Sequence, residues 1–371
     1  MRASSRKLIV LLLGLVVLGF VVYRSSGMIH LADFSGAKLL HAIRNARVSY
    51  LLLSIVAIYG CYALRALRWG EFQKHVGQAH FWGIYEMTLA GFAAVFLLGR
   101  AGEAVRPLLL ARKGKLPVAD TFGIYVLERL FDTASTVVIA AVGLLIFTAH
   151  AHNGEAAGTL ETAAKTGGSL LAAGVLGAAV ILVYVRLHGS AMLERRLKGW
   201  LTAHGWRSSV AKIILGFIRG VQTIRTIRDL AAAVIYSAIH WALVLAIYFL
   251  VTQSFGGKLQ QLSLGDVMLV LAFTLVGSAV QLPVAGGGAQ VASFLAYTAI
   301  FGVEKEAATM AAVVLWLVSF AACSLAGVPI LIREGFSLGQ LKELAEQEKE
   351  VLEKEVAAGS GIAARPGEKP E

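Results

Sequence analysis

Hydrophobic residues in this chain form long continuous runs, which are separated by short polar connections. Several windows of about 20 residues contain few or no charges, and this is the length that an α-helix needs to cross the hydrocarbon core of a bilayer. Because the runs do not alternate between apolar and polar positions, they predict helices and not the strands of a membrane barrel. The predicted membrane segments are approximately 8–23, 49–64, 81–99, 119–149, 168–186, 230–252, 267–283, 286–301 and 307–332.

The polar connections indicate how these segments are oriented. Residues 186–230 carry nine basic residues against two acidic ones. Connections rich in Lys and Arg stay on the cytoplasmic side, so this one is predicted to be cytoplasmic. Residues 150–167 and 253–266 are poor in basic residues and are predicted to lie outside. The stretch 191–228 also has an apolar stripe at helical spacing, which predicts a helix on the inner leaflet.

Two further basic connections conflict with a simple series of spans. The first contains Arg65, Arg68 and Lys74, and the second contains Arg100, Arg106, Arg112, Lys113 and Lys115. Both are predicted to be cytoplasmic, yet only one apolar segment lies between them. We therefore expect residues 81–116 to form a re-entrant hairpin that enters and leaves on the cytoplasmic side, because irregular backbone is tolerated at membrane depth when protein surrounds it.

A second interruption lies in the stretch "QLPVAGGGAQ", where Pro283 and three consecutive glycines break the apolar run 267–301. So many helix breakers do not fit a straight helix. A hairpin entering from outside would leave the last segment running inward and would place both termini in the cytoplasm. The predicted fold class is an all-α polytopic membrane protein with about six full spans plus two re-entrant helical hairpins. Weak sequence similarity between the two broken regions indicates an inverted repeat, and the alternative is that the few identities arose by chance.

The chain divides into a membrane domain, residues 1–335, and a charged tail, residues 336–371, which is predicted to be helical at first and then disordered. Residues 24–48 fit this topology poorly, because they are placed outside and yet carry Arg24, Lys38, Arg44 and Arg47. Two interpretations stay open. The segment is an amphipathic helix on the outer interface, or the first span is assigned wrongly.

Composition agrees with a membrane protein and excludes several other classes. Hydrophobic residues make up 57% of the chain and charged residues only 15%, against about 25% charged residues in soluble domains. The formal net charge of +11 is assigned to loops that meet anionic lipid, so no nucleic-acid partner is expected. Cys61 and Cys323 lie in apolar segments, and neither a disulfide framework nor a metal site is expected. No phosphate-binding loop motif is present, and no cofactor is expected.

The first candidate site lies in "GRAGEAVRP", where Arg100, Glu103 and Arg106 are three residues apart and share one helix face. One interpretation is a set of interfacial side chains that reach toward water. The other is a polar pocket at the tip of the hairpin, in which guanidinium groups bind a phosphate in a bidentate manner.

The second candidate site is the sequence "LERLFD", which places Glu128, Arg129 and Asp132 well inside the apolar segment 119–149. A charge near the bilayer centre costs about 2.5–3.5 kcal/mol on insertion scales, so such residues face a partner or a wet cavity. Arg129 can pair with one carboxylate, and Arg100 and Arg106 are candidates for the other. A structural clamp between the hairpin and this segment is the alternative, and it is compatible with a binding site.

The glycine loop is the third candidate. Gly286, Gly287 and Gly288 would let backbone N–H groups approach an anion closely, and a helix beginning near Gly288 would add partial positive charge. Gln290 is a further hydrogen-bond partner at depth. The alternative is a tight re-entrant turn that binds nothing. His240, beside Trp241, is expected to be a packed polar residue without a functional role.

The sequences around the three candidate sites resemble the signatures of a known protein family. The stretch "GRAGEAVRPLLLARKGKLPVADTFGIYVLERLFD" resembles the first signature of the lysylphosphatidylglycerol synthase transmembrane-region family, also called the flippase-like domain. That signature combines a Gly-x-x-Gly-Glu-x-x-Arg core with a later Glu-Arg-x-x-Asp. The matching positions are Gly99, Gly102, Glu103, Arg106, Glu128, Arg129 and Asp132. The second signature resembles "LPVAGGGAQVASFLAYTAIFGV", residues 282–303, and the resemblance spans about 8–335.

Two departures limit what the resemblance implies. Many members carry a Glu after the glycine loop, where this chain has Gln290 and Val291. Members that synthesise aminoacylated lipid carry a soluble transferase domain, which is not found here, so synthase activity is not implied. The resemblance implies movement of a lipid with a polar head.

We therefore expect a non-enzymatic lipid flippase or transporter of the bacterial inner membrane. Its expected partners are membrane lipids, either anionic or aminoacylated phospholipids or other phosphate-linked lipids, with a second copy of the chain or a lipid-modifying enzyme as further partners. The alternatives are a scaffold that recruits such an enzyme through residues 186–230 and a membrane-embedded transferase that acts on lipid-linked substrates.

Overall fold

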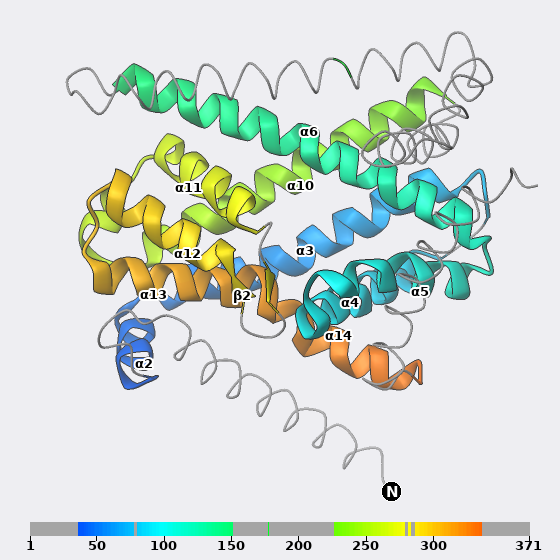
Figure 1. Ribbon diagram of the computed structural model, residues 1–371, viewed down its shortest axis with the longest axis horizontal. Helices are drawn as coiled ribbons and strands as arrows, with labels where there is room; N and C mark the ends of the chain where they lie inside the picture. Colours follow the sequence, from blue (N-terminus) through cyan, green and yellow to red (C-terminus); the bar gives the residue numbers. More distant parts are fainter. Residues whose placement is uncertain are drawn as a thin grey trace, which may run out of the picture.

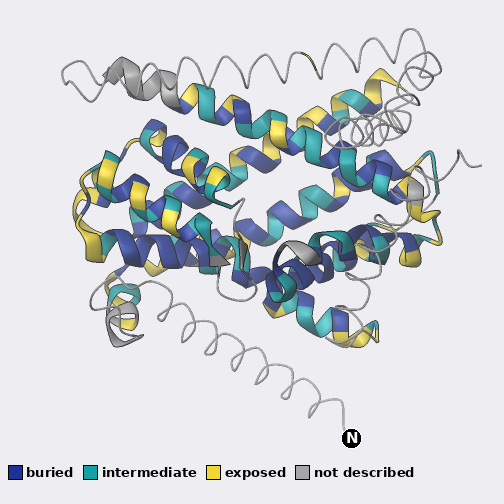
Figure 2. Ribbon diagram, in the orientation of Figure 1, coloured by how far each residue is buried: buried dark blue, intermediate teal, exposed yellow. Residues whose placement is uncertain are grey.

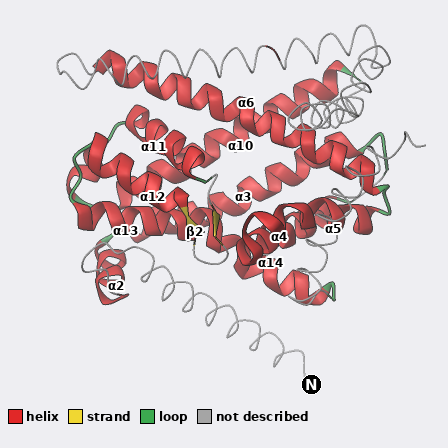
Figure 3. Cartoon of the chain, viewed as in Figure 1, coloured by secondary structure: helices red, strands yellow, loops and turns green. Residues whose placement is uncertain are grey.

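A computed structural model of the chain describes residues 36–77, 80–150, 177, 226–278, 281–282 and 286–335. The predicted segments 8–23 and 168–186, the helix predicted on the inner leaflet and the charged tail lie outside these residues, apart from Gly177 and the start of the next helix. Within the described ranges the chain forms helices joined by short loops, together with two paired strands of two residues each (Figure 1, Figure 3). The all-helical membrane fold is therefore confirmed, whereas the number of spans stays a prediction.

Four helical stretches are long and apolar enough to cross a membrane: α3 (Val48–Gln73), α4 (Phe81–Leu98), α10 (Ile227–Ser254) and the run Lys305–Arg333. This last run consists of α13 (Lys305–Trp316), a π-helical turn η4 (Leu317–Ala321) and α14 (Ala322–Arg333). A further helix, α6 (Val118–His150), has 33 residues and crosses the molecule beside α10 and α11 (Figure 1). Burial is concentrated between the helices, and large exposed apolar side chains such as Leu52, Val56 and Val234 cover the outside (Figure 2).

The first predicted hairpin is present. It consists of α4, the 3-10 turn η1 (Gly99–Ala104) and α5 (Val105–Gly114), which packs back against α4. Gly102 allows the chain to fold back closely, because a Cβ there would lie 2.3 Å from the Ala94 carbonyl oxygen. Gly99 has a φ of 67°, a conformation that glycine adopts most easily.

The second predicted hairpin is also present. It consists of α11 (Leu264–Gly277), strands β1 (Gln281–Leu282) and β2 (Gly286–Gly287), and α12 (Gly288–Leu295), which continues into a π-helical turn η3 (Ala296–Ile300). The two strands pair antiparallel, with Gln281 opposite Gly287 and Leu282 opposite Gly286, a detail that was not predicted. Gly277 lets α11 and α12 approach, since a Cβ there would lie 2.3 Å from the Gly288 carbonyl oxygen.

The helix ends fall into two groups, and each hairpin begins and ends within one group. Lys74 at the end of α3 pairs with Asp229 at the start of α10 at 2.7 Å. Lys113 of α5 pairs with Glu334, just after α14, at 2.9 Å. These contacts gather the ends of the first hairpin on one side of the molecule.

On the other side, the Arg47 amide donates to the Ser254 carbonyl oxygen at 2.9 Å, and this bond joins the start of α3 to the end of α10. Lys258 of the 3-10 turn η2 (Gly257–Gln261), which precedes α11, donates to the Gly302 carbonyl oxygen after η3 at 3.1 Å. The two hairpins thus enter from opposite sides, as expected. Their tips meet in the middle, where β1 lies against η1.

One part of the topology argument was wrong. Arg65 and Arg68 do not belong to a cytoplasmic connection, because α3 continues to Gln73 and places both residues inside the helix bundle. Arg106 likewise lies buried in α5. The basic residues that stay at the helix ends are Lys74, Arg112, Lys113 and Lys115. Residues 24–48 contain a short helix, α2 (Gly36–Asn45), and its relation to the bilayer stays a prediction.

Candidate functional site

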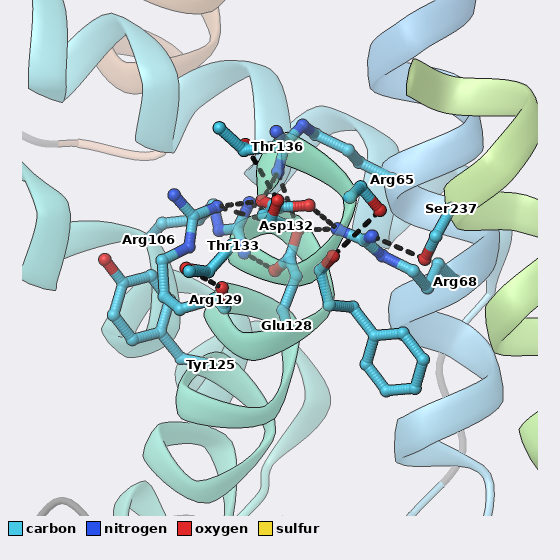
Figure 4. A network of polar contacts seen from close by, with 12 residues as sticks. Arg65, Arg68, Arg106, Tyr125, Glu128, Arg129, Asp132, Thr133, Thr136 and Ser237 are labelled. Carbon is cyan, nitrogen blue, oxygen red and sulfur yellow. Dashed lines mark hydrogen bonds and ion pairs between the residues drawn. The ribbon is translucent and has the colours of Figure 1, made fainter. Parts of the chain in front are cut away.

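Six charged side chains from three helices meet in the interior of the bundle and form what we call the charged cluster (Figure 4). It consists of Arg65 and Arg68 from α3, Arg106 from α5, and Glu128, Arg129 and Asp132 from α6. Helical spacing explains the arrangement. The two arginines of α3 are three residues apart, and the two carboxylates of α6 are four apart, so each pair lies on one face of its helix.

Asp132 accepts hydrogen bonds at both carboxylate oxygens. Its Oδ1 accepts from Arg68 Nη2 at 2.7 Å, and its Oδ2 accepts from Arg65 Nη1 at 2.8 Å. Arg129, one turn earlier on α6, pairs with the same Oδ2 at 2.9 Å. The three guanidinium groups leave little of this carboxylate available to another cation.

Glu128, like Asp132, contacts guanidinium groups at both of its carboxylate oxygens. Its Oε1 accepts from Arg65 Nη1 at 2.9 Å and from Arg68 Nη2 at 3.0 Å. Arg106 approaches from the other side, where its Nη1 donates to the same oxygen at 3.3 Å and its Nη2 contacts Oε2. A fourth helix supports the cluster, because Arg68 Nη1 donates to the Ser237 hydroxyl of α10 at 2.8 Å.

The charged cluster is deeply buried. Arg68 and Glu128 are each 1% exposed, Arg106 is 4% exposed and Asp132 is 6% exposed. Removing charges from water costs several kcal/mol per ion, and ion pairing offsets this only with good geometry. Four guanidinium groups meet two carboxylates here, so the cluster carries an excess of positive charge.

Aromatic rings surround the arginines. The Arg106 guanidinium carbon lies 5.1 Å from the centroid of Trp69, 5.3 Å from that of Phe92 and 5.7 Å from that of Tyr125. Cation–π contacts of this kind stabilise a desolvated guanidinium group. The Tyr125 hydroxyl in turn donates to Glu103 Oε2 at 2.9 Å, which fixes the ring beside the cluster.

A cavity of about 910 Å³ opens beside the charged cluster, between the two hairpins. Arg65, Glu103, Arg106, Arg129 and Asp132 line one part of its wall. Gln290 and Ser293 of α12 line another part, and apolar side chains from several helices line most of the rest. The cavity therefore joins a charged region to an apolar one, as a site for an amphiphile would require.

The model of the family described as "Lysylphosphatidylglycerol synthase TM region" matches residues 8–327, which is most of the chain. The chain belongs to this family. The predicted resemblance is thus confirmed, and a lipid-related function in a multi-pass membrane protein follows from it at that general level. No curated protein matches the chain.

In this member of the synthase TM-region family, most residues of the first signature come together. Arg106, Glu128, Arg129 and Asp132 form the charged cluster, and Glu103 lies next to it. The side chain of Arg100 lies outside the described part of the structure, so its pairing with a carboxylate stays a prediction. Ligand binding by these residues stays a prediction as well.

The glycine loop differs in one respect from the expectation. The helix α12 begins at Gly288, as predicted, but the Gly287 amide donates to Gln290 Oε1 at 2.7 Å. This amide is therefore already used and is not available to an anion. Gln290 Nε2, by contrast, is buried without a hydrogen-bond partner among the described residues. Anion binding by Gly286 and Gly288 stays a prediction.

Four residues of the site were missed by sequence reasoning. Arg65 and Arg68 were taken for loop residues, although Trp69 and Phe72 after them indicate that the apolar helix continues. His240 and Trp241 line the cavity from α10. Both side chains are buried, and neither His240 ring nitrogen nor Trp241 Nε1 has a partner in the described part of the chain. His240 is thus a packed polar residue, as expected, but its ring nitrogens have no partner among the described residues.

Proposed function

We propose that the protein is a transporter that moves a lipid with a phosphate-bearing head group between the leaflets of the bacterial inner membrane. In this proposal both termini lie in the cytoplasm, and the protein has no enzymatic activity of its own. The observation that carries this proposal is the position of the charged cluster. It forms part of the wall of a cavity that lies between two hairpins entering from opposite sides.

Charge and shape support the proposal together. Ionisable residues inside a membrane bundle are expensive and mark substrate pathways. A lipid head group would offset the excess positive charge, while its acyl chains would stay against apolar walls. Paired broken helices around a central site are also the arrangement of transporters that expose a site alternately to each side.

The direct test is lipid transfer by the purified protein in proteoliposomes. Fluorescently labelled phosphatidylglycerol would be placed in both leaflets, and a membrane-impermeant quencher would report the fraction that reaches the outer leaflet. Wild-type protein is expected to raise the transfer rate over empty vesicles. The variant Arg106→Gln is expected to reduce that rate at least about tenfold, because the cavity wall loses one of the positive charges that attract the phosphate.

Two further variants control for folding. Arg129→Gln changes an arginine whose side chain is 38% exposed, so it tests the same role with less structural risk. Arg333→Gln removes a charge on the molecular surface that pairs with Glu86, and it is expected to retain full transfer. Unchanged transfer in both Arg106→Gln and Arg129→Gln would exclude the charged cluster as the site. No transfer by wild-type protein would favour the scaffold, and chemical modification of the lipid would favour the transferase.

A further inference from the structure

We infer that the cavity selects an anionic phosphodiester lipid over an aminoacylated lipid with a net positive head group. This inference rests on the proposed function and names its substrate class. The shared chemistry of the two lipids is the phosphate, so the distinction depends on what surrounds an added ammonium group. Four features of the cavity wall carry the argument.

Among the described residues, two of the three carboxylates at or just behind the cavity wall, Asp132 and Glu128, are already paired with guanidinium groups, and only Glu103 is not. Asp132 accepts from Arg65 and Arg68 and pairs with Arg129. Glu128 lies behind the cavity wall and is 1% exposed, with Arg65, Arg68 and Arg106 against its oxygens. A lysyl or similar head group would have to displace a buried guanidinium group to reach either one.

The guanidinium groups, by contrast, have N–H donors that are not hydrogen-bonded within the described part of the chain. The Nε atoms of Arg106 and Arg129, two arginines that line the cavity, have no hydrogen-bond partner among the described residues. Arg65, Arg106 and Arg129 line the cavity, where they outnumber the two lining carboxylates, Glu103 and Asp132. In a medium of low dielectric constant, this excess attracts a phosphate and repels an added cation.

The aromatic faces are also occupied. An ammonium group can be held by the faces of aromatic rings in place of a carboxylate. Here the Arg65 guanidinium lies 5.2 Å from the centroid of Phe92, and that of Arg129 lies 5.3 Å from the centroid of Tyr125. Arg106 contacts both of these rings and Trp69. The rings beside the cluster therefore already hold cations.

Neutral donors also belong to the cavity wall. Gln290 Nε2 and Trp241 Nε1 are buried there without partners in the described residues. An N–H group binds the hydroxyl and ester oxygens of a glycerol-based head group without requiring charge. These positions fit the uncharged part of a phosphodiester lipid.

Glu103 provides the sharpest control. It lines the cavity and accepts a hydrogen bond from the uncharged Tyr125 hydroxyl. If an aminoacylated lipid binds, its ammonium group would be expected at this carboxylate. The variant Glu103→Gln therefore separates the two lipids, because it removes the cavity's best site for a cation while leaving the arginines in place.

The experiment measures binding and not transport. Delipidated full-length protein in a neutral detergent would bind fluorescent phosphatidylglycerol, and unlabelled phosphatidylglycerol and lysylphosphatidylglycerol with identical acyl chains would compete. Phosphatidylglycerol is expected to compete at least about tenfold more strongly. Glu103→Gln is expected to widen this ratio, Arg129→Gln to narrow it, and Arg333→Gln to leave it unchanged.

Equal or stronger competition by the lysyl lipid would overturn the inference, most clearly if Glu103→Gln abolished that competition. Glycerophosphoglycerol, which has the same head group without acyl chains, is expected to compete at least about a hundredfold more weakly. Competition at the strength of the lipid would show a soluble phosphate ligand and would also overturn the inference. Selective binding without transfer in vesicles refutes only the transport proposal, whereas transfer of both lipids without selective binding refutes only the selectivity.

Discussion

Arg68 connects three helices through one side chain. Its guanidinium donates to Asp132 and Glu128 of α6 and to Ser237 of α10, and the residue is 1% exposed. The other three arginines of the cluster still balance the two carboxylates, but Asp132 Oδ1 loses this donor, and a buried acceptor left without its donor costs about 1–3 kcal/mol. Arg68→Met is therefore expected to lower the free energy of unfolding by about this amount, as measured by chemical denaturation in detergent micelles.

Lys113→Gln is the matched control, because it also breaks an ion pair. The Lys113 side chain is 40% exposed and pairs with Glu334, which is 25% exposed. Surface pairs contribute about 0–1 kcal/mol, so this variant is expected to unfold almost as wild type does. Equal losses for the two variants would show that burial does not determine the energy of these pairs.

At the same scale, the sequence identified four of the six residues of the charged cluster, Arg106 among them. Glu128, Arg129 and Asp132 were found because charges in an apolar segment require partners. Arg65 and Arg68 were missed because a charge near the end of an apolar run fits a loop as well as a helix. Only the packing of α3 against α6 and α10 decides between the two, and that packing involves residues far apart in the sequence.

At the scale of elements, each hairpin contains a glycine that lies against the backbone of another segment of the same hairpin. A Cβ at Gly102 would lie 2.3 Å from the Ala94 carbonyl oxygen, and a Cβ at Gly277 would lie 2.3 Å from that of Gly288. Both obstacles are backbone atoms, so the arms would have to separate. Gly102→Ala and Gly277→Ala are each expected to destabilise the protein by about 1–3 kcal/mol, measured by thermal unfolding in detergent.

Gly256→Ala is the control for the change from glycine to alanine itself. No atom lies within 4 Å of a Cβ at that position, and its φ of −75° suits alanine. This variant is expected to be as stable as wild type, because alanine also restricts the unfolded chain. Wild-type stability of both hairpin variants would contradict the close packing of the arms.

Helix breakers and charges were sufficient to predict both hairpins. Pro283 and the glycines marked the second one, and the basic residues on both sides of 81–99 marked the first. The strand pairing of Gln281 with Gly287 was not predictable, because two residues give no periodic pattern. The contact between β1 and η1 was not predictable either, since it joins segments of the chain that share no local signal.

At the scale of the whole molecule, the two groups of helix ends differ in their surroundings. The group that includes the ends of α3 and α5 carries Lys74, Lys113 and Lys115, and the basic connection 186–230 leads directly into the start of α10 on the same side. The opposite group includes Arg47 at the start of α3, and residues 253–266, which lead into α11 on that side, carry a single Lys and a single Asp. The excess of basic residues predicts that the first group is cytoplasmic.

Labelling of single cysteines in intact cells tests this orientation together with the opposed entry of the hairpins. Cys61→Ala and Cys323→Ala would remove the native thiols. In that background, Lys113→Cys places a single thiol at the end of the first hairpin, and Lys258→Cys places a single thiol just before the second hairpin. Both lysines are exposed. A membrane-impermeant maleimide is expected to label Lys258→Cys in intact cells and Lys113→Cys only after permeabilisation, because the hairpin ends lie on opposite sides of the membrane. If the two labelling results were exchanged, the orientation in the membrane would be the reverse of the predicted one, but the fold would stand. Labelling of both thiols from the same side would mean that the hairpins do not enter from opposite faces of the membrane. The cavity between their tips could not then connect the two leaflets.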